Sequence, residues 1–193
     1  MKRPLIVGIG GTPNPNSSTE QALELALRAA EQANARTRLI HGRYLMKLPL
    51  YLAEGSPDAG QDLIEAVRAA DGLIIASPGY HGSISGAVKN AIDYLEETAG
   101  DTRPYLDGLP VGLIVTAFGW QATGSTLTTM RSIVHALRGW PTPLGAAINT
   151  SRSIFCEGVC SDANAAKQLA LVGRQVAGFA ALALRDPAIG ETA

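Results

Sequence analysis

A chain of 193 residues can bury a full hydrophobic core without disulfides or metal ions, and 46% hydrophobic with 17% charged residues is typical of a compact globular protein. A formal net charge of −1 provides no electrostatic attraction for nucleic acid or an anionic membrane. No apolar run approaches the roughly 20 residues that span a bilayer, and the apolar stretch after residues 1–4 is too short for a signal peptide. We therefore expect a cytoplasmic protein without nucleic-acid or membrane partners.

Short apolar segments alternate with amphipathic ones along the chain. Short apolar segments predict five parallel strands, at residues 5–9, 37–42, 72–77, 109–116 and 144–149. The first is apolar on both faces, as a central parallel strand must be, and the second is the weaker one. Apolar residues at helical spacing predict five helices, at residues 18–33, 62–70, 86–97, 127–137 and 163–184. Residues 44–60 are expected to form a long irregular connection.

Two local patterns support the helix assignments. Ser18 is a plausible N-cap for the first helix, with Gln21 at the spacing of a capping box. In the third helix, Lys89 and Asp93 are spaced to form an exposed ion pair.

Strands that alternate with helices predict an α/β fold with a doubly wound sheet. The arrangement that uses five such units is a flavodoxin-like three-layer sandwich, a five-stranded parallel sheet in the order 2-1-3-4-5. Residues 1–185 would form this single domain, with 186–193 as a flexible tail. Because the strand order reverses between strands one and three, the loops after strands one, three and four should converge at one edge of the sheet.

The loop after strand one, residues 10–19, is rich in glycine and hydroxyl side chains and runs directly into a helix. Free amides and the positive end of the helix dipole make this a candidate phosphate site, and the alternative is a turn with an ordinary N-cap. The loop lacks the pattern of a P-loop, and Pro13 stands where a dinucleotide-binding fingerprint needs its third glycine.

The other two loops offer surfaces for a planar ring. The loop that starts at Pro78 presents backbone amides and Tyr80, unless Tyr80 and His81 only pack or face solvent. Residues 117–124 add amides and Trp120, which could line the mouth of the pocket or be buried at a subunit contact. A phosphate site and a ring site one strand apart suggest a mononucleotide with a planar head, and FMN is the usual ligand of this geometry.

The sequence Pro78-Gly79-Tyr80-His81-Gly82-Ser83, followed by Ser85-Gly86 and Lys89-Asn90-Ala91-Ile92-Asp93, resembles the P-E-Y-N/H-G-S…G-x-x-K-N-A-x-D pattern of the NADPH-dependent FMN reductases. The loop after strand one is similar to the G-S-x-R-x-x-S phosphate loop of that family. Asn14 stands where the family usually has arginine, and Gly79 replaces a common glutamate.

This resemblance implies an enzyme that binds FMN and transfers hydride from NADPH or NADH to the flavin, and then to free flavin, a quinone or a similar small acceptor. It also implies a homodimer or tetramer, and a flavin-dependent monooxygenase is a conceivable partner. The expected FMN-binding residues are Gly11, Thr12, Asn14, Ser17, Ser18, Thr19, Pro78, Gly79, Tyr80, His81, Gly82, Ser83, Phe118, Gly119 and Trp120. Arg43, Arg103 and Arg152 are candidates for the 2′-phosphate of NADPH.

No side chain is expected to act as an obligatory catalyst, because a flavin itself performs the difficult step. Cys156 and Cys160 are interpreted as two free thiols, with a local disulfide or a redox role as alternatives, and no metal site is expected. A flavodoxin-like electron carrier is the alternative function, although such carriers usually have strongly acidic surfaces. A receiver-type signalling domain would need acidic residues where this chain has glycines and Ser77-Pro78.

Overall fold

The computed structural model describes residues 2–52, 58–156 and 158–186. The principal strands are β1 (Leu5–Gly10), β2 (Arg36–His41), β3 (Gly72–Tyr80), β5 (Pro110–Ala117) and β7 (Ala146–Asn149). Shorter strands are β4 (Ser83–Ile84), β6 (Trp140–Pro141), β8 (Phe155–Cys156) and β9 (Val159–Cys160). The helices are α1 (Ser18–Gln32), α2 (Gly42–Leu45), α3 (Gln61–Ala69), α4 (Gly86–Asp93), α5 (Trp120–Ala136) and α6 (Ala163–Ala183), with a 3₁₀ helix η1 (Tyr94–Thr98) directly after α4.

The α/β class and the flavodoxin-like architecture are confirmed, but the expected sheet of five strands is wrong. Within the described residues the main sheet has seven strands, in the order β2-β1-β3-β5-β6, with β7 also paired to β5 and β4 paired antiparallel to β3. The strands predicted from sequence do neighbour one another: β1 lies between β2 and β3, and β5 lies between β3 and β7. The two additional members, β4 and β6, have only two residues each, too few to show a periodic pattern.

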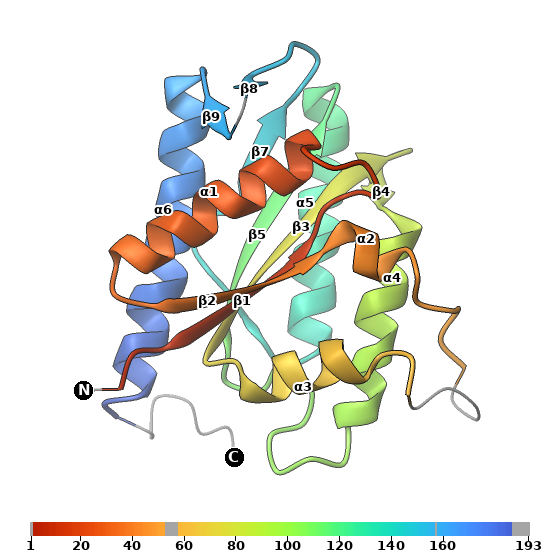
Figure 1. Ribbon diagram of the computed structural model, residues 1–193, viewed down its shortest axis with the longest axis vertical. Helices are drawn as coiled ribbons and strands as arrows, with labels where there is room; N and C mark the ends of the chain where they lie inside the picture. Colours follow the sequence, from red (N-terminus) through yellow and green to blue (C-terminus); the bar gives the residue numbers. More distant parts are fainter. Residues whose placement is uncertain (1, 53–57, 157, 187–193) are drawn as a thin grey trace.

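The sheet is covered on both faces (Figure 1), and strand residues alternate between two hydrophobic clusters. Val111, Leu113 and Val115 of β5 pack toward the cluster that includes α3, α4 and α5, whereas Ile114 packs toward α1 and α6. Helices α1 and α6 lie side by side, so closely that a Cβ atom at Gly173 would collide with the carbonyl of Ala26. The two clusters form the core of a three-layer sandwich.

Several predicted boundaries move. Helix α5 begins at Trp120 rather than at residue 127. The prediction began too late because the first buried residues of this helix, Thr123 and Thr126, are threonines and do not extend the apolar pattern. The segment 44–60 was expected to be irregular, but α2 occupies its start. The domain prediction, 1–185 followed by a tail at 186–193, stays a prediction, and only Asp186 of that tail lies among the described residues.

Cys156 and Cys160 are both free thiols. In the β8–β9 hairpin, Cys156 pairs with Val159 and Phe155 pairs with Cys160, so the two thiols point to opposite faces. The local disulfide that the spacing left open is therefore not formed. In the part of the chain that the structure describes, no helix combines the length and apolarity needed to cross a membrane.

Candidate functional site

The loop between β1 and α1 lies at the carboxyl edge of the sheet, tight against the end of β3. A Cβ atom at Gly10, which has φ 144°, would collide with the carbonyl of Ala76, so only glycine fits this crossing. The loop ends at Ser17, which caps α1 by accepting a hydrogen bond from Glu20 N at 3.3 Å. The predicted cap, Ser18, is one residue too late and is the first residue of the helix.

Neutral donors dominate this loop. Ser17 Oγ accepts from Glu20, which leaves its own hydroxyl hydrogen available for a ligand. Residues 10–19 contain no charged side chain. Asn14, which stands where the resembled phosphate-loop pattern has an arginine, is exposed. An anion bound here would be held by hydroxyls, by backbone amides and by the positive end of the α1 dipole.

The second wall of the site is a β-hairpin rather than the loop predicted after residue 77. Strand β3 continues to Tyr80 and pairs with β4, so that Tyr80 lies opposite Ser83. The two turn residues, His81 (φ 51°) and Gly82 (φ 84°), both have positive φ, which defines a type I′ turn. The hairpin therefore presents a defined backbone at the edge of the sheet.

A buried hydroxyl fixes the base of this hairpin. Ser77 Oγ donates to Pro78 O at 2.9 Å and accepts from Ser85 N at 3.0 Å. Ser85 then caps α4 by accepting a hydrogen bond from Val88 N. The hairpin is thus held between the end of β3 and the start of α4.

The loop between β1 and α1 (residues 10–17, the first loop) and the β3–β4 hairpin border a cavity of about 300 Å³. It is lined by Gly11, Thr12, Pro13, Gly42, Met46, Pro78, Tyr80, Ser85, Gly86 and Ala87. Four of the predicted residues, Gly11, Thr12, Pro78 and Tyr80, are therefore brought together. The remaining predicted residues do not line this cavity, although Ser17 and Ser18 begin α1 at the same edge.

The residues predicted in the loop after strand four do not line this cavity. Phe118 and Trp120 are 83% and 68% exposed, at the end of β5 and the start of α5. The first turn of α5 follows Gly119, whose position offers no capping side chain, so this helix also has free amides at the same edge.

Two predicted contacts are redirected by packing. Thr19 is buried, and its Oγ1 lies 2.6 Å from Thr116 Oγ1 of β5, so this hydroxyl is used inside the core. Gly79 faces α5, where a Cβ atom would lie 2.9 Å from Thr126 Oγ1 and 3.2 Å from Ala117 Cβ. The position where the resembled motif has glutamate is therefore closed to a large side chain by α5.

Several lining residues were missed by the sequence reasoning. Gly42 and Met46 follow β2, whose carboxyl end lies at the same edge as those of β1 and β3. A Cβ atom at Gly42 would collide with the backbone of Thr12, so β2 and the first loop meet directly. The rule that the carboxyl ends of all parallel strands share one edge could have identified this segment.

A buried carboxylate also lies beside the first loop. Glu20 is 4% exposed, and its Oε1 lies 2.7 Å from Nδ1 of His41, the last residue of β2. The other oxygen, Oε2, has no hydrogen-bond partner among the described residues. The pair connects the first turn of α1 to the end of β2.

Part of the sequence motif has a structural role. Asn90 accepts a hydrogen bond from Tyr51 N at 2.8 Å and donates one to Pro49 O at 2.9 Å, and Tyr94 also donates to Pro49 O. The expected ion pair of Lys89 and Asp93 is confirmed at 2.6 Å. Residues 89–94 therefore anchor the segment after α2 on α4.

The guanidinium of Arg103, a candidate for the NADPH phosphate, has partners within the protein. It donates to the carbonyls of Val67, Arg68 and Ala70 at the end of α3. Burial lowers the pKa of the Arg103 guanidinium. The three carbonyl contacts hold this side chain at the end of α3.

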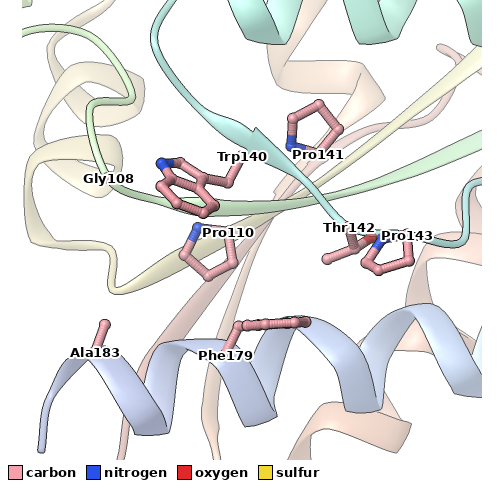
Figure 2. Close-up of a pocket in the computed structure, with 8 residues that line it drawn as sticks. All are labelled: Gly108, Pro110, Trp140, Pro141, Thr142, Pro143, Phe179 and Ala183. Atoms are coloured by element: carbon pink, nitrogen blue, oxygen red, sulfur yellow. The ribbon is translucent and has the colours of Figure 1, made fainter. Parts of the chain in front are cut away.

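A second recess, of about 260 Å³, lies at the opposite edge of the sheet, where β5 and β6 begin and α6 ends. Trp140 and Pro110 form one wall and Phe179 the other (Figure 2). The lining has no charged side chain and none of the predicted site residues. An anionic nucleotide has no suitable partner there.

Comparison with known proteins identifies the family of the chain. The profile of the family described as NADPH-dependent FMN reductase matches residues 4–152. An FMN-dependent NADPH-azoreductase from Staphylococcus aureus is 40% identical over 91 residues, which cover 47% of this chain and 45% of the relative. The chain thus spans a little under half the length of the curated relatives that it matches.

Solved structures share the fold. An NADH:FMN oxidoreductase in its apo form superimposes with a TM-score of 0.74 at 23% identity, over 97% of this chain and 94% of that chain. The flavoenzyme NAD(P)H:(acceptor) oxidoreductase from Paracoccus denitrificans gives 0.76 at 19% identity, over 94% and 98%. An archaeal flavodoxin gives 0.59 at 11% identity, over 92% and 98%.

Proposed function

The chain belongs to the NADPH-dependent FMN reductase family, and we propose that it is an FMN-dependent oxidoreductase that takes hydride from NADPH or NADH and reduces a small acceptor. The observation that carries this proposal is the cavity of about 300 Å³ in which the first loop and the β3–β4 hairpin meet at the carboxyl edge of the sheet. Ligands of doubly wound α/β proteins bind at this place.

The residues present fit FMN in kind. The phosphate would lie at the start of α1, where the Ser17 hydroxyl and free helix amides are donors. The ring would lie against Pro78 and Tyr80, and a Cβ atom at Gly86 would meet only open space, so the cavity is open above α4. Without an arginine at position 14, the α1 dipole supplies the positive potential.

Bound FMN would supply the hydride and electron chemistry, and the protein binds and orients. The described lining of the cavity contains no carboxylate, imidazole or ammonium group, so no side chain there is assigned as a proton donor or acceptor near neutral pH. Tyr80, which is 54% exposed, stands at the mouth, where its ring can limit access of water to the ligand.

The acceptor that we propose is free flavin, a quinone or a comparable small planar molecule, because exposed aromatic rings, Phe118 and Trp120, stand where β5 ends and α5 begins. These rings also support a homo-oligomer, in which they would be covered. A flavin-dependent monooxygenase as recipient of reduced flavin, and a cytoplasmic location, belong to the same proposal.

The test is an anaerobic reduction. Purified protein saturated with FMN is mixed with NADPH, and the visible absorption of the flavin is followed. We expect rapid bleaching that depends on protein concentration. Flavin that binds tightly but is not bleached would contradict the enzyme and favour an electron carrier. Absence of binding would contradict the site.

A further inference from the structure

The side chain of Gln21 joins two parts of the molecule that are far apart in sequence. Its Nε2 donates to Asn16 O in the first loop at 2.6 Å, and its Oε1 accepts from Gly158 N in the β8–β9 hairpin at 3.0 Å. Gln21 is 8% exposed. Since a carbonyl must accept and an amide must donate, only one orientation of this side-chain amide satisfies both contacts.

The loop end of this connection is a residue in an unusual conformation. Asn16 has φ 58°, in the left-handed region, and directly precedes Ser17, the N-cap of α1. A hydrogen bond to the carbonyl of Asn16 fixes the peptide plane through which the chain turns into the helix. The orientation of Ser17 and of the first helix amides therefore depends on this bond.

The hairpin end is held from the same helix twice. Arg28 Nη2 donates to Gly158 O at 2.9 Å, while Gly158 N donates to Gln21. Phe155 at the base of the hairpin is buried in the cluster of α1 and α6. Figure 1 shows the hairpin above the start of α1, although 137 residues separate Gln21 from Gly158.

From these contacts we propose that Gln21 is a positioning residue, which couples the geometry of the phosphate-binding loop to the contact of Gly158 with α1. The inference rests on the proposed function, because it takes the first loop to bind the FMN phosphate. A phosphate that orders the first loop stabilises the hairpin through Gln21, and by reciprocity an ordered hairpin tightens phosphate binding.

Three substitutions separate this role from simple packing. Gln21→Met removes both hydrogen bonds at similar volume. Arg28→Met removes the second contact to Gly158, together with the surface ion pair of Arg28 with Glu24, and leaves the bond to Asn16. Gln32→Met, at the exposed last position of the same helix, is the matched control.

The probes are FMN and riboflavin, which differ by the phosphate. Dissociation constants are measured by quenching of flavin fluorescence, and hydrogen exchange of the Gly158 amide is measured with and without FMN. We expect Gln21→Met to weaken FMN binding about tenfold, because the donors to the charged phosphate lose their alignment. Riboflavin binding should weaken less than about twofold, because riboflavin has no phosphate. FMN should slow exchange at Gly158 in the wild-type protein and in Gln32→Met, but not in Gln21→Met. Arg28→Met should show faster exchange and a smaller loss of FMN affinity.

The outcomes are distinct. Wild-type protein that binds no FMN defeats the proposed function. Wild-type binding with an unchanged Gln21→Met, or an equal loss of FMN and riboflavin affinity, overturns only the positioning role. If Gln21→Met does not fold, two other results overturn the coupling. One is that FMN leaves hydrogen exchange of the Gly158 amide unchanged in the wild-type protein. The other is that this amide exchanges in Arg28→Met at the wild-type rate.

Discussion

Thr19 Oγ1 and Thr116 Oγ1 lie 2.6 Å apart in the core, 97 residues apart in sequence. Thr19 is in the first turn of α1, and Thr116 is near the carboxyl end of β5. The hydrogen bond therefore connects the helix that follows the first loop to the strand that precedes Phe118 and Trp120. Glu20 contacts His41 of β2, and Gln21 contacts Gly158 of the β8–β9 hairpin. The first turn of α1, which follows the first loop, therefore contacts three neighbouring elements.

Replacing Thr116 by valine should destabilise the protein. Valine has nearly the same shape, so the change leaves the buried hydroxyl of Thr19 without a partner, which costs about 1–3 kcal/mol. Urea unfolding measures the free energy of unfolding. The double variant Thr19→Val/Thr116→Val should recover part of the loss, because no polar group then stays unpaired, and a double variant as unstable as the sum of the singles would contradict this interpretation.

The close approach of Gly79 to α5 makes a second prediction. Gly79→Ala should force the hairpin away from Thr126 and Ala117, and overpacking of this kind costs about 1–3 kcal/mol. FMN affinity should fall with stability, since Pro78 and Tyr80 move with the hairpin. The control is Gly124→Ala on the exposed side of α5, where a Cβ atom meets nothing and better helix propensity should stabilise by up to about 1 kcal/mol.

A third prediction concerns acid stability. The two carboxylate oxygens of Asp101 accept hydrogen bonds from Arg68 at 2.7 and 3.1 Å, and this contact holds the pKa of Asp101 below its ordinary value. A lowered pKa in the folded state stabilises the protein above the unfolded pKa, and that stabilisation is lost as the pH falls. The difference in urea midpoint between wild type and Asp101→Asn should therefore be present at neutral pH and shrink below about pH 4. A difference that grows in acid would contradict the assignment.

The sequence was sufficient for the parts of the fold that depend on repeated patterns. The buried strands are short continuous apolar runs, the amphipathic helices α1, α3, α4 and α6 repeat at 3.6 residues, and each was predicted within a few residues. The family motif led to Tyr80 and Pro78, which line the cavity.

What the sequence could not show depends on single contacts between distant segments. The start of α5 was missed because its buried residues are threonines, and the hairpin was missed because β4 has two residues. Gln21 was interpreted as half of a capping box, but its side chain binds Asn16 and Gly158. No local pattern indicates a partner 137 residues away.

A fourth prediction separates the two halves of the site. Ser17→Ala removes the N-cap of α1, at a cost of about 1 kcal/mol in stability, and also a hydroxyl donor to the phosphate. FMN affinity should fall about tenfold, whereas riboflavin affinity should change little. Tyr80→Ala should weaken both ligands to a similar degree, because it removes a contact to the ring. Calorimetric titration of both ligands measures these differences, and equal losses of both ligands in Ser17→Ala would argue against a phosphate at this helix.

The central claim is that FMN lies in the cavity between the first loop and the β3–β4 hairpin. A crystal structure of the protein grown with FMN tests it most directly. We expect the phosphate at the start of α1, within hydrogen-bond distance of Ser17, and the ring beside Pro78 and Tyr80. A flavin found elsewhere, for instance between Trp140 and Phe179 in the recess at the opposite edge, would contradict it.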